Sequence, residues 1–222
     1  GVRAMMRKNC LIRKLQASET LGAISVICTD KTGTLTRSEM VVIGITTPGL
    51  DLEVTGAGYA PEGEFLLDGR SIDPGDHPGV RQFLRTVLFC NHATLTRDEA
   101  GEWQILGTPT EGALVVVAVK AGFLQDTIPD AIKEFSFDST RKRMTVIFHE
   151  DEGDVAYVKG APEAILARSS DVLVGDSVVS LTEGLRDVIL KEISGYASDG
   201  LRVLGAAYRP LPPDLPSTAD AV

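Results

Sequence analysis

The chain has few cysteines and no long hydrophobic run, and both absences narrow the kind of protein it encodes. Its three cysteines, Cys10, Cys28 and Cys90, lie far apart in 222 residues and show no metal-ligand spacing. They are typical of reduced thiols in the cytoplasm rather than of a disulfide framework. The best apolar run, residues 113–119, ends at Lys120 and is too short to cross a bilayer. We therefore expect this chain, taken alone, to be soluble.

An excess of positive charge is also lacking. The chain has 22 basic and 31 acidic residues, a net charge of -9, which argues against a nucleic-acid partner. The first 18 residues are an exception, because they carry five basic residues and no acidic one. The rest of the composition, 43% hydrophobic and 24% charged, is ordinary for a globular protein. The length suits one large domain, or one medium domain with part of another.

One short segment, Asp30-Lys31-Thr32-Gly33-Thr34-Leu35-Thr36, carries the sharpest chemical signal. The apolar, β-branched residues 24–29 before it predict a buried parallel strand. An aspartate at the carboxyl end of such a strand lies where open α/β sheets bind ligands. That carboxylate can attack a phosphoryl group and hold it as an acyl phosphate. The alternative is a strand-ending turn in which the aspartate caps its own backbone.

The remaining chain predicts an α+β fold with a mixed, mainly antiparallel sheet and flanking helices. Thr108, Pro109 and Glu111 form a helix start with an N-cap, a proline at the first position and a capping box. The sequence contains no Gly-rich phosphate loop and no dinucleotide fingerprint. Strands are predicted at 40–46, 51–55, 64–67, 94–96, 102–106, 133–137, 143–149, 155–159 and 202–208, a hairpin at 172–180, and helices at 80–91, 109–120, from 162, and at 182–198.

Without a phosphate loop, a nucleotide has to be held by side chains from several segments. A base needs an aromatic platform and phosphates need cations, and both occur between Phe137 and Lys142. Lys159 stands at a predicted strand end, where Gly160 permits close approach of a ligand.

Arg202 and Leu204 are two apart on one predicted strand, which places them on one face. Each of these residues alone has an ordinary explanation, such as a core phenylalanine or a strand-end lysine reaching water. The three histidines, His77, His92 and His149, have no partners at ligand spacing and are expected to be structural.

Together, the aspartate segment and the three later segments resemble P-type cation-transporting ATPases of the calcium- and sodium-pump type. The resemblance implies that Asp30 is the phosphorylated residue and that Lys31, Thr32 and Thr34 surround the phosphate. It also implies that Mg²⁺ is held by Asp30 and the Thr32 carbonyl. For ATP it implies a pocket in which Phe137 stacks on adenine, Glu111 touches the adenine edge, Lys142, Lys159 and Gly160 line the site, Arg202 reaches the phosphates and Leu204 packs on base or ribose.

The resemblance also implies a division of the chain. Residues 1–38 would be a stalk segment and the first strand of a Rossmann-like phosphorylation domain, 39–209 the nucleotide-binding domain, and 210–222 a linker or tail. The chain would then be a cytoplasmic part of an integral membrane protein. Its partners would be ATP and the rest of the pump: the remaining phosphorylation domain, the actuator domain and the transmembrane helices. The isolated chain is expected to be monomeric and to bind nucleotide with little turnover.

Two other functions stay open at this point. The aspartate segment is also similar to the nucleophile motif of haloacid-dehalogenase-type phosphatases, which usually carry a second aspartate two residues later. Thr32 occupies that position here and cannot supply the proton step, which favours a long-lived phosphoenzyme. The third possibility is a non-catalytic module that senses nucleotide. The transported cation cannot be identified from these residues.

Overall fold

The computed structural model describes residues 5, 7–8, 23–30, 39–175 and 177–213. The chain divides into two compact units, Gly1–Ser38 and Glu39–Val222, which are described separately here. In the first unit, residues 24–30 form no strand, and Val26 and Ile27 are 74% and 76% exposed. The prediction of a buried strand at 24–29 is therefore wrong for this chain. No described strand pairs with this segment to take up its backbone hydrogen bonds or cover its side chains.

The second unit contains four sheets within its described residues, and every strand pair in them is antiparallel. The predicted fold class, α+β with a mainly antiparallel sheet, is thereby confirmed. The largest sheets have the orders β1-β2-β3-β4 and β12-β9-β8-β7. The strands are β1 Gly44–Thr47, β2 Leu50–Val54, β3 Phe65–Leu67, β4 Arg70–Ile72, β5 Thr94–Arg97, β6 Trp103–Leu106, β7 Lys133–Asp138, β8 Arg143–Glu150, β9 Gly153–Gly160, β10 Asp171–Val174, β11 Ser177–Ser180 and β12 Gly205–Pro210.

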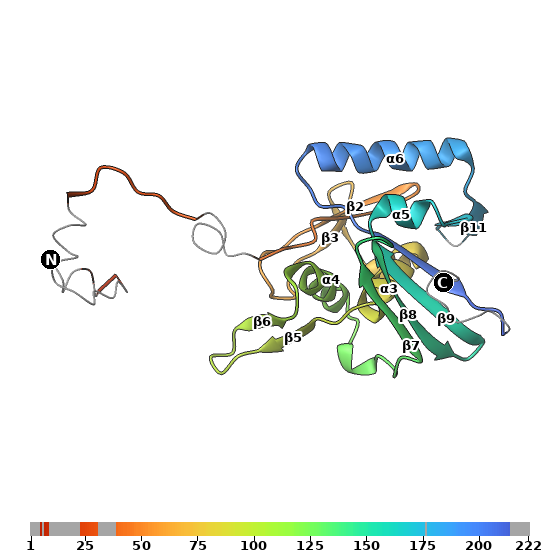
Figure 1. Cartoon of the computed structure of the whole chain (residues 1–222), viewed down its shortest axis with the longest axis horizontal. Helices are drawn as coiled ribbons and strands as arrows, with labels where there is room; N and C mark the ends of the chain where they lie inside the picture. The colour runs from red at the N-terminus through yellow and green to blue at the C-terminus, as the bar shows by residue number, and fades with distance from the viewer. Residues whose placement is uncertain (1–4, 6, 9–22, 31–38, 176, 214–222) are drawn as a thin grey trace. The chain divides into compact units, whose positions relative to one another are not determined.

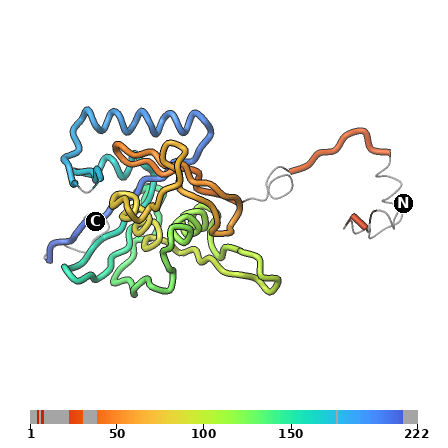
Figure 2. The backbone as a smooth tube through the Cα atoms, turned by 180° about the vertical axis from the view of Figure 1, so that it is seen from behind, coloured from red at the N-terminus to blue at the C-terminus, as the bar shows by residue number. Residues whose placement is uncertain are grey.

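Helices pack on these sheets and begin at the predicted residue or within two residues of it. The helices are α3 Pro78–Phe89, α4 Pro109–Lys120, α5 Pro162–Leu166 and α6 Glu183–Ser198, with 3-10 turns η1 Pro74–Asp76 and η2 Gln125–Thr127. Thr108 caps α4 by accepting a hydrogen bond from the Glu111 backbone N–H, and residues 112–118 are all buried. By contrast α6 has no buried residue and lies along the outside of the unit (Figures 1 and 2). None of the described helices is long and apolar enough to cross a membrane.

The core of the β12-β9-β8-β7 sheet is built on one face of β8. Met144, Val146 and Phe148 are buried on one face together with Tyr157 of β9. Phe89, at the end of α3, packs against Phe148 and Tyr157 with tilted, edge-to-face rings whose centroids lie 5.0 and 5.2 Å from its own. This packing anchors α3 to the sheet, and α3 in turn packs against α4 in the second core. The two cores thus hold the start of α4 against the end of β9.

Strands β12 and β1 begin at least three residues later than the sequence predicts, because strand pairing sets their starts. β12 begins at Gly205 rather than at residue 202, since its partner β9 ends at Gly160, the residue paired with Gly205. Beyond Gly160 the chain turns into α5, so Arg202 and Leu204 have no strand to pair with. Their expected placement on one strand face is wrong. β1 similarly begins at Gly44, where pairing with Glu53 of β2 starts.

Candidate functional site

The end of β9 is tied to the first turn of α4 by an ion pair. Lys159 Nζ lies 2.8 Å from Glu111 Oε1, and the two side chains are only 10% and 17% exposed. The other carboxylate oxygen of Glu111 accepts a hydrogen bond from Thr108 Oγ1 at 3.2 Å. Burial alone would raise the pKa of Glu111, but the hydrogen bond and charge of Lys159 outweigh burial and lower it. The Glu111 carboxylate therefore contacts both the capping residue Thr108 and Lys159.

A second cation reaches the same helical turn from a different segment. Arg202 Nη1 donates a hydrogen bond to Thr110 Oγ1 at 2.9 Å. Thr110 and Glu111 are neighbours, so Lys159 and Arg202 converge on adjacent residues at the N-terminus of α4. We call these four residues, Thr110, Glu111, Lys159 and Arg202, the Glu111 cluster. Two cations at the positive end of a helix create a setting that favours an anion.

The predicted segments also meet at one end of the β12-β9-β8-β7 sheet. Asp138 pairs with Arg143, Arg143 with Gly160, and Gly160 with Gly205, which forms one row across the sheet. The predicted residues Phe137, Lys142, Lys159 and Leu204 each precede one member of this row in sequence. Three separate segments of the chain, the β7–β8 hairpin, the end of β9 and the start of β12, are therefore brought together at this end of the sheet, which we call the sheet edge. Thr110 and Glu111 join this edge through Arg202 and Lys159.

Phe137 presents its ring to solvent at this edge. Its exposure of 63% removes the explanation that it is a core residue. The turn after it is closed by Asp138, which accepts hydrogen bonds from the backbone N–H groups of Arg141 and Thr140, and these bonds lower the pKa of the Asp138 carboxyl. Lys142 ends the turn with a φ of 54°, in the left-handed region.

Gly160 is constrained by the chain itself. A Cβ on Gly160 would lie 2.3 Å from the carbonyl oxygen of Lys142 and 2.7 Å from the Cα of Arg143. Its neighbour Ala161 donates a backbone hydrogen bond to the same Lys142 carbonyl at 2.9 Å. The close approach expected of a ligand at Gly160 is thus made by the β7–β8 turn, and this contact explains the glycine.

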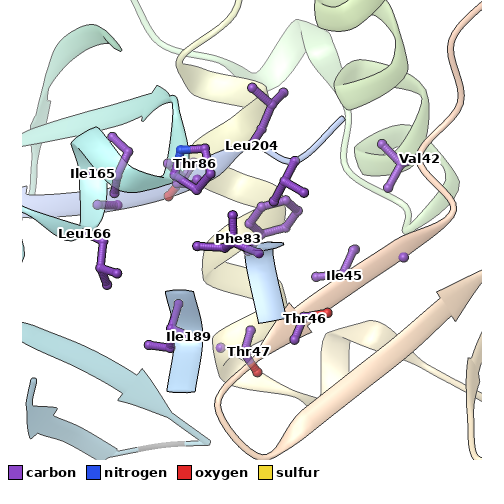
Figure 3. A pocket seen from close by; sticks show the side chains of 18 of the residues that line it. Val42, Ile45, Thr46, Thr47, Phe83, Thr86, Ile165, Leu166, Ile189 and Leu204 are labelled. Atoms are coloured by element: carbon purple, nitrogen blue, oxygen red, sulfur yellow. The ribbon is translucent and has the colours of Figure 1, made fainter. Parts of the chain in front are cut away.

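Next to the cluster lies a large cavity of about 1660 Å³ (Figure 3). Arg202, Leu204 and Thr110 line it, together with apolar side chains that include Phe83 of α3, Ile165 of α5 and Ile189 of α6. Glu111, Phe137, Lys142 and Lys159 are not part of its lining. The predicted site residues therefore divide between this cavity and the exposed end of the sheet, with Thr110 and Glu111 at the junction.

Three residues, one in the cluster and two beside it, were not predicted as site residues from the sequence. They are Thr110, which holds Arg202, and the pair His92 and Glu134, whose Nε2 and Oε2 atoms are 2.8 Å apart. The hydrogen bond from His92 lowers the pKa of Glu134. His92 and Glu134 are 42 positions apart, and no spacing rule connects them. Only the folded chain reveals this pair.

The aspartate segment contributes one described residue, Asp30, which is exposed at the end of residues 23–30. Lys31, Thr32 and Thr34 lie outside the described residues. Within the part of the chain that the structure describes, no three or more His, Cys, Asp or Glu side chains are grouped so that they could hold a metal ion. The roles given to these four residues stay predictions.

Comparison with known proteins agrees with the resemblance read from the sequence. Residues 79–221 match the family model described as "P-type ATPase, cytoplasmic domain N". The chain is 37% identical over 215 residues to the calcium-transporting ATPase of Bacillus subtilis, a match that covers 95% of this chain and 24% of that protein.

It is also 37% identical to the cation-transporting ATPase pma1 of Synechocystis, a match covering 96% of this chain and 24% of that protein. The human calcium-transporting ATPase type 2C member 1 is 38% identical, with 95% and 23% covered. The chain thus spans about a quarter of the length of these relatives.

Proposed function

This chain belongs to the P-type ATPases and contains their cytoplasmic domain N, and on that premise we propose that it binds MgATP at the Glu111 cluster and the adjoining sheet edge. In the full-length pump, the bound ATP would phosphorylate Asp30 and drive cation transport across a membrane. We assign nucleotide binding to residues 39–209. The observation that carries this proposal is the convergence of Lys159 and Arg202 on one turn of α4, beside the row Asp138, Arg143, Gly160 and Gly205.

Each residue of the edge suits one part of the nucleotide. The exposed ring of Phe137 is available to stack on adenine, and the Glu111 carboxylate can accept a hydrogen bond from the amino edge of the base. Lys142, Lys159 and Arg202 supply positive charge for the phosphates. Leu204 offers an apolar contact to base or ribose, and Gly160 keeps the Lys142 turn close to the end of β9.

The chemical step would be an in-line attack by an Asp30 carboxylate oxygen on the γ-phosphorus of ATP. The new oxygen–phosphorus bond forms as the bond to the bridging oxygen breaks and ADP leaves. Mg²⁺ enters as part of the MgATP substrate, where Asp30 and the Thr32 carbonyl are its proposed protein ligands. Lys31, Thr32 and Thr34 would contact the transferred phosphate. Water later hydrolyses the acyl phosphate, and Thr32 slows that step because it offers no proton-transferring group.

The cation and the partners belong to the longer protein. Two of the relatives above are named calcium-transporting ATPases, so Ca²⁺ is the first cation to test. The proposed partners are the remaining phosphorylation domain, an actuator domain and transmembrane helices, which would place this chain on the cytoplasmic side of a membrane.

ATP titration followed by NMR tests the nucleotide site. One stacked base and a few exposed cations suggest a binding free energy of about -4 to -5 kcal/mol, which is a Kd of about 0.2–1 mM. Phe137→Ala should weaken binding by about five- to thirtyfold through lost stacking. The matched control is Leu106→Ala on β6, since Leu106 is 61% exposed and lies outside the edge. Unchanged ATP affinity in Phe137→Ala would contradict the proposal that Phe137 stacks on the adenine base.

A second measurement addresses Asp30. Incubated with MgATP, this 222-residue chain should gain no acid-stable, hydroxylamine-sensitive phosphate on Asp30, because residues 24–30 form no strand that would hold the carboxylate in line. Label at Asp30 would contradict that expectation. Rapid hydrolysis of a generic phosphate ester would instead favour the dehalogenase-type phosphatase.

A further inference from the structure

The pair His92 and Glu134 lies beside the Glu111 cluster and has no role in the function proposed above. His92 Nε2 is 2.8 Å from Glu134 Oε2, and Ser136 Oγ donates a hydrogen bond to Glu134 Oε1 at 2.5 Å. The two side chains are 52% and 34% exposed, so both are open to solvent and to a ligand. An imidazole is therefore paired with a hydrogen-bonded carboxylate beside the proposed nucleotide site.

Strand register places Glu134 and Lys159 on the same face of the sheet. Glu134 of β7 pairs with Val146, and Lys159 of β9 pairs with Met144. Val146 and Met144 are two residues apart on β8, so their side chains and those of their partners point to one face. Glu134 and Lys159 therefore face the same space and interact electrostatically.

The turn that carries His92 is attached to α4 at the cluster itself. Asn91 Nδ2 donates hydrogen bonds to the backbone oxygens of Glu111 at 3.1 Å and Val87 at 3.0 Å. Asn91 Oδ1 accepts from the backbone N–H of Ala93 at 2.8 Å. His92 lies between these two fixed neighbours, so its imidazole is held next to Glu134 and close enough to Glu111 to affect that carboxylate.

The net charge of His92 and its charged neighbours depends on whether His92 carries a proton. Among the described residues, the charged groups that face His92 are Glu134 of β7 and Glu111 of α4, with Lys159 of β9 paired to Glu111. Cys90, at the end of α3, is buried, and burial raises its pKa to about 12, so the thiol stays neutral at ordinary pH. With neutral His92, the two carboxylates and Lys159 sum to one negative charge. With protonated His92 the sum is zero.

We propose that His92 is a positioning residue of the nucleotide site: when protonated, it holds and neutralises Glu134, so that only Glu111 still offsets the charge that Lys159 presents to the phosphates of ATP. When His92 is neutral, Glu134 competes with the phosphates for the field of Lys159. Affinity for an anionic nucleotide is therefore higher when His92 carries its proton than when it is neutral, and the pH range to examine is about pH 5 to 8. This inference rests on the proposed nucleotide site and adds pH regulation to it.

The test is the Kd of ATP measured across that pH range for this chain and for His92→Gln. Because the terminal phosphate of ATP also titrates there, the quantity compared is the ratio of the two Kd values at each pH. We expect ATP to bind the unsubstituted chain about three- to tenfold more tightly, relative to His92→Gln, at about pH 5.5 than at about pH 8. Glu134→Gln should bind ATP more tightly than the unsubstituted chain at about pH 8, and its affinity should lose the pH dependence due to His92.

His149→Gln is the matched control. His149 also pairs with a carboxylate, Asp154, at 2.8 Å, but on the far end of β8 and β9 and with 77% exposure. Its Kd values should follow those of the unsubstituted chain at every pH. Adenosine, which has no phosphates, should show no His92-dependent change, because the proposed effect acts on phosphate charge.

The outcomes separate this inference from the proposed function. Equal pH dependence in the unsubstituted chain and His92→Gln, with ATP bound in both, overturns the role of His92 and leaves the nucleotide site intact. The same pH dependence for adenosine also overturns it. No ATP binding at any pH overturns the proposed function and this inference together. Should His92→Gln fail to fold by circular dichroism, Glu134→Gln decides the question.

Discussion

Residues 24–29 and strand β8 contain similar sequences and have opposite environments. Both include a Val-Ile pair within an apolar, β-branched stretch. Val146 and Ile147 of β8 are 4% and 2% exposed, whereas Val26 and Ile27 are 74% and 76% exposed. β8 lies between β7 and β9, which satisfy its backbone on both sides. The difference shows that composition selects a candidate strand, and neighbouring strands determine whether it forms.

The largest expected effect comes from the same substitution made at both places. Ile147→Ala should lower the free energy of unfolding by about 2–5 kcal/mol, because it leaves a cavity in a packed core. Ile27→Ala should change it by less than about 0.5 kcal/mol, since an exposed side chain loses no packing. Urea unfolding monitored by circular dichroism measures both. Similar losses at the two sites would show that residues 24–29 are packed in solution.

The two described cysteines extend the comparison to reactivity. Cys28 is exposed, whereas Cys90 is buried and burial raises the pKa of its thiol to about 12. A thiol reagent at about pH 8 should therefore modify Cys28 at least about a hundredfold faster than Cys90 in the folded chain, as followed by mass spectrometry of peptides. In urea the two rates should become similar. Fast labelling of Cys90 without denaturant would mean that the end of α3 separates readily from β8.

A smaller effect distinguishes the two acidic residues that the sequence singles out. Glu111→Gln should cost about 1–3 kcal/mol near neutral pH because Lys159 loses its charged partner in a mostly buried place. Asp30→Asn should change the free energy of unfolding by less than about 0.5 kcal/mol, since Asp30 is exposed. Urea midpoints of the two variants measure this difference.

The contribution of Glu111 to the free energy of unfolding should also fall as pH is lowered. Its pKa is lowered from 4.5 in the folded chain, so the unfolded state binds a proton more readily. The stabilisation is present above about pH 4.5 and is lost as pH falls through the folded pKa. The difference between the unsubstituted chain and Glu111→Gln should therefore shrink in urea titrations at low pH. A difference that stays constant would contradict the ion pair as its source.

Local signals in the sequence predicted local structure well. Thr108 and Pro109 mark the start of α4, Thr182 caps α6 by accepting from the Leu185 N–H, and the predicted strand at 143–149 forms as β8 with Met144, Val146 and Phe148 packed on one face. These features depend on residues three or four apart, or on alternate residues, so one stretch of sequence contains all the necessary information. The fold class followed from the order of such elements.

Local sequence patterns do not predict pairings between residues that are distant in the chain. Lys159 and Glu111 are 48 positions apart, and Arg202 and Thr110 are 92 apart. The start of β12 at Gly205 depends on where β9 ends, which its own sequence does not show. The candidate residues Lys159 and Arg202 came from their own segments and from the family resemblance, whereas Thr110, His92 and Glu134 needed the fold.

The tight contact at Gly160 affects how a mutational screen of this domain should be interpreted. An alanine there would push against the Lys142 carbonyl and displace the loop that presents Phe137 and Lys142. Random mutagenesis scored by loss of ATP binding would then recover Gly160 alongside true contact residues, although its effect would be transmitted through the main chain. Such a screen would identify residues that hold the β7–β8 turn in place as well as residues that contact the nucleotide.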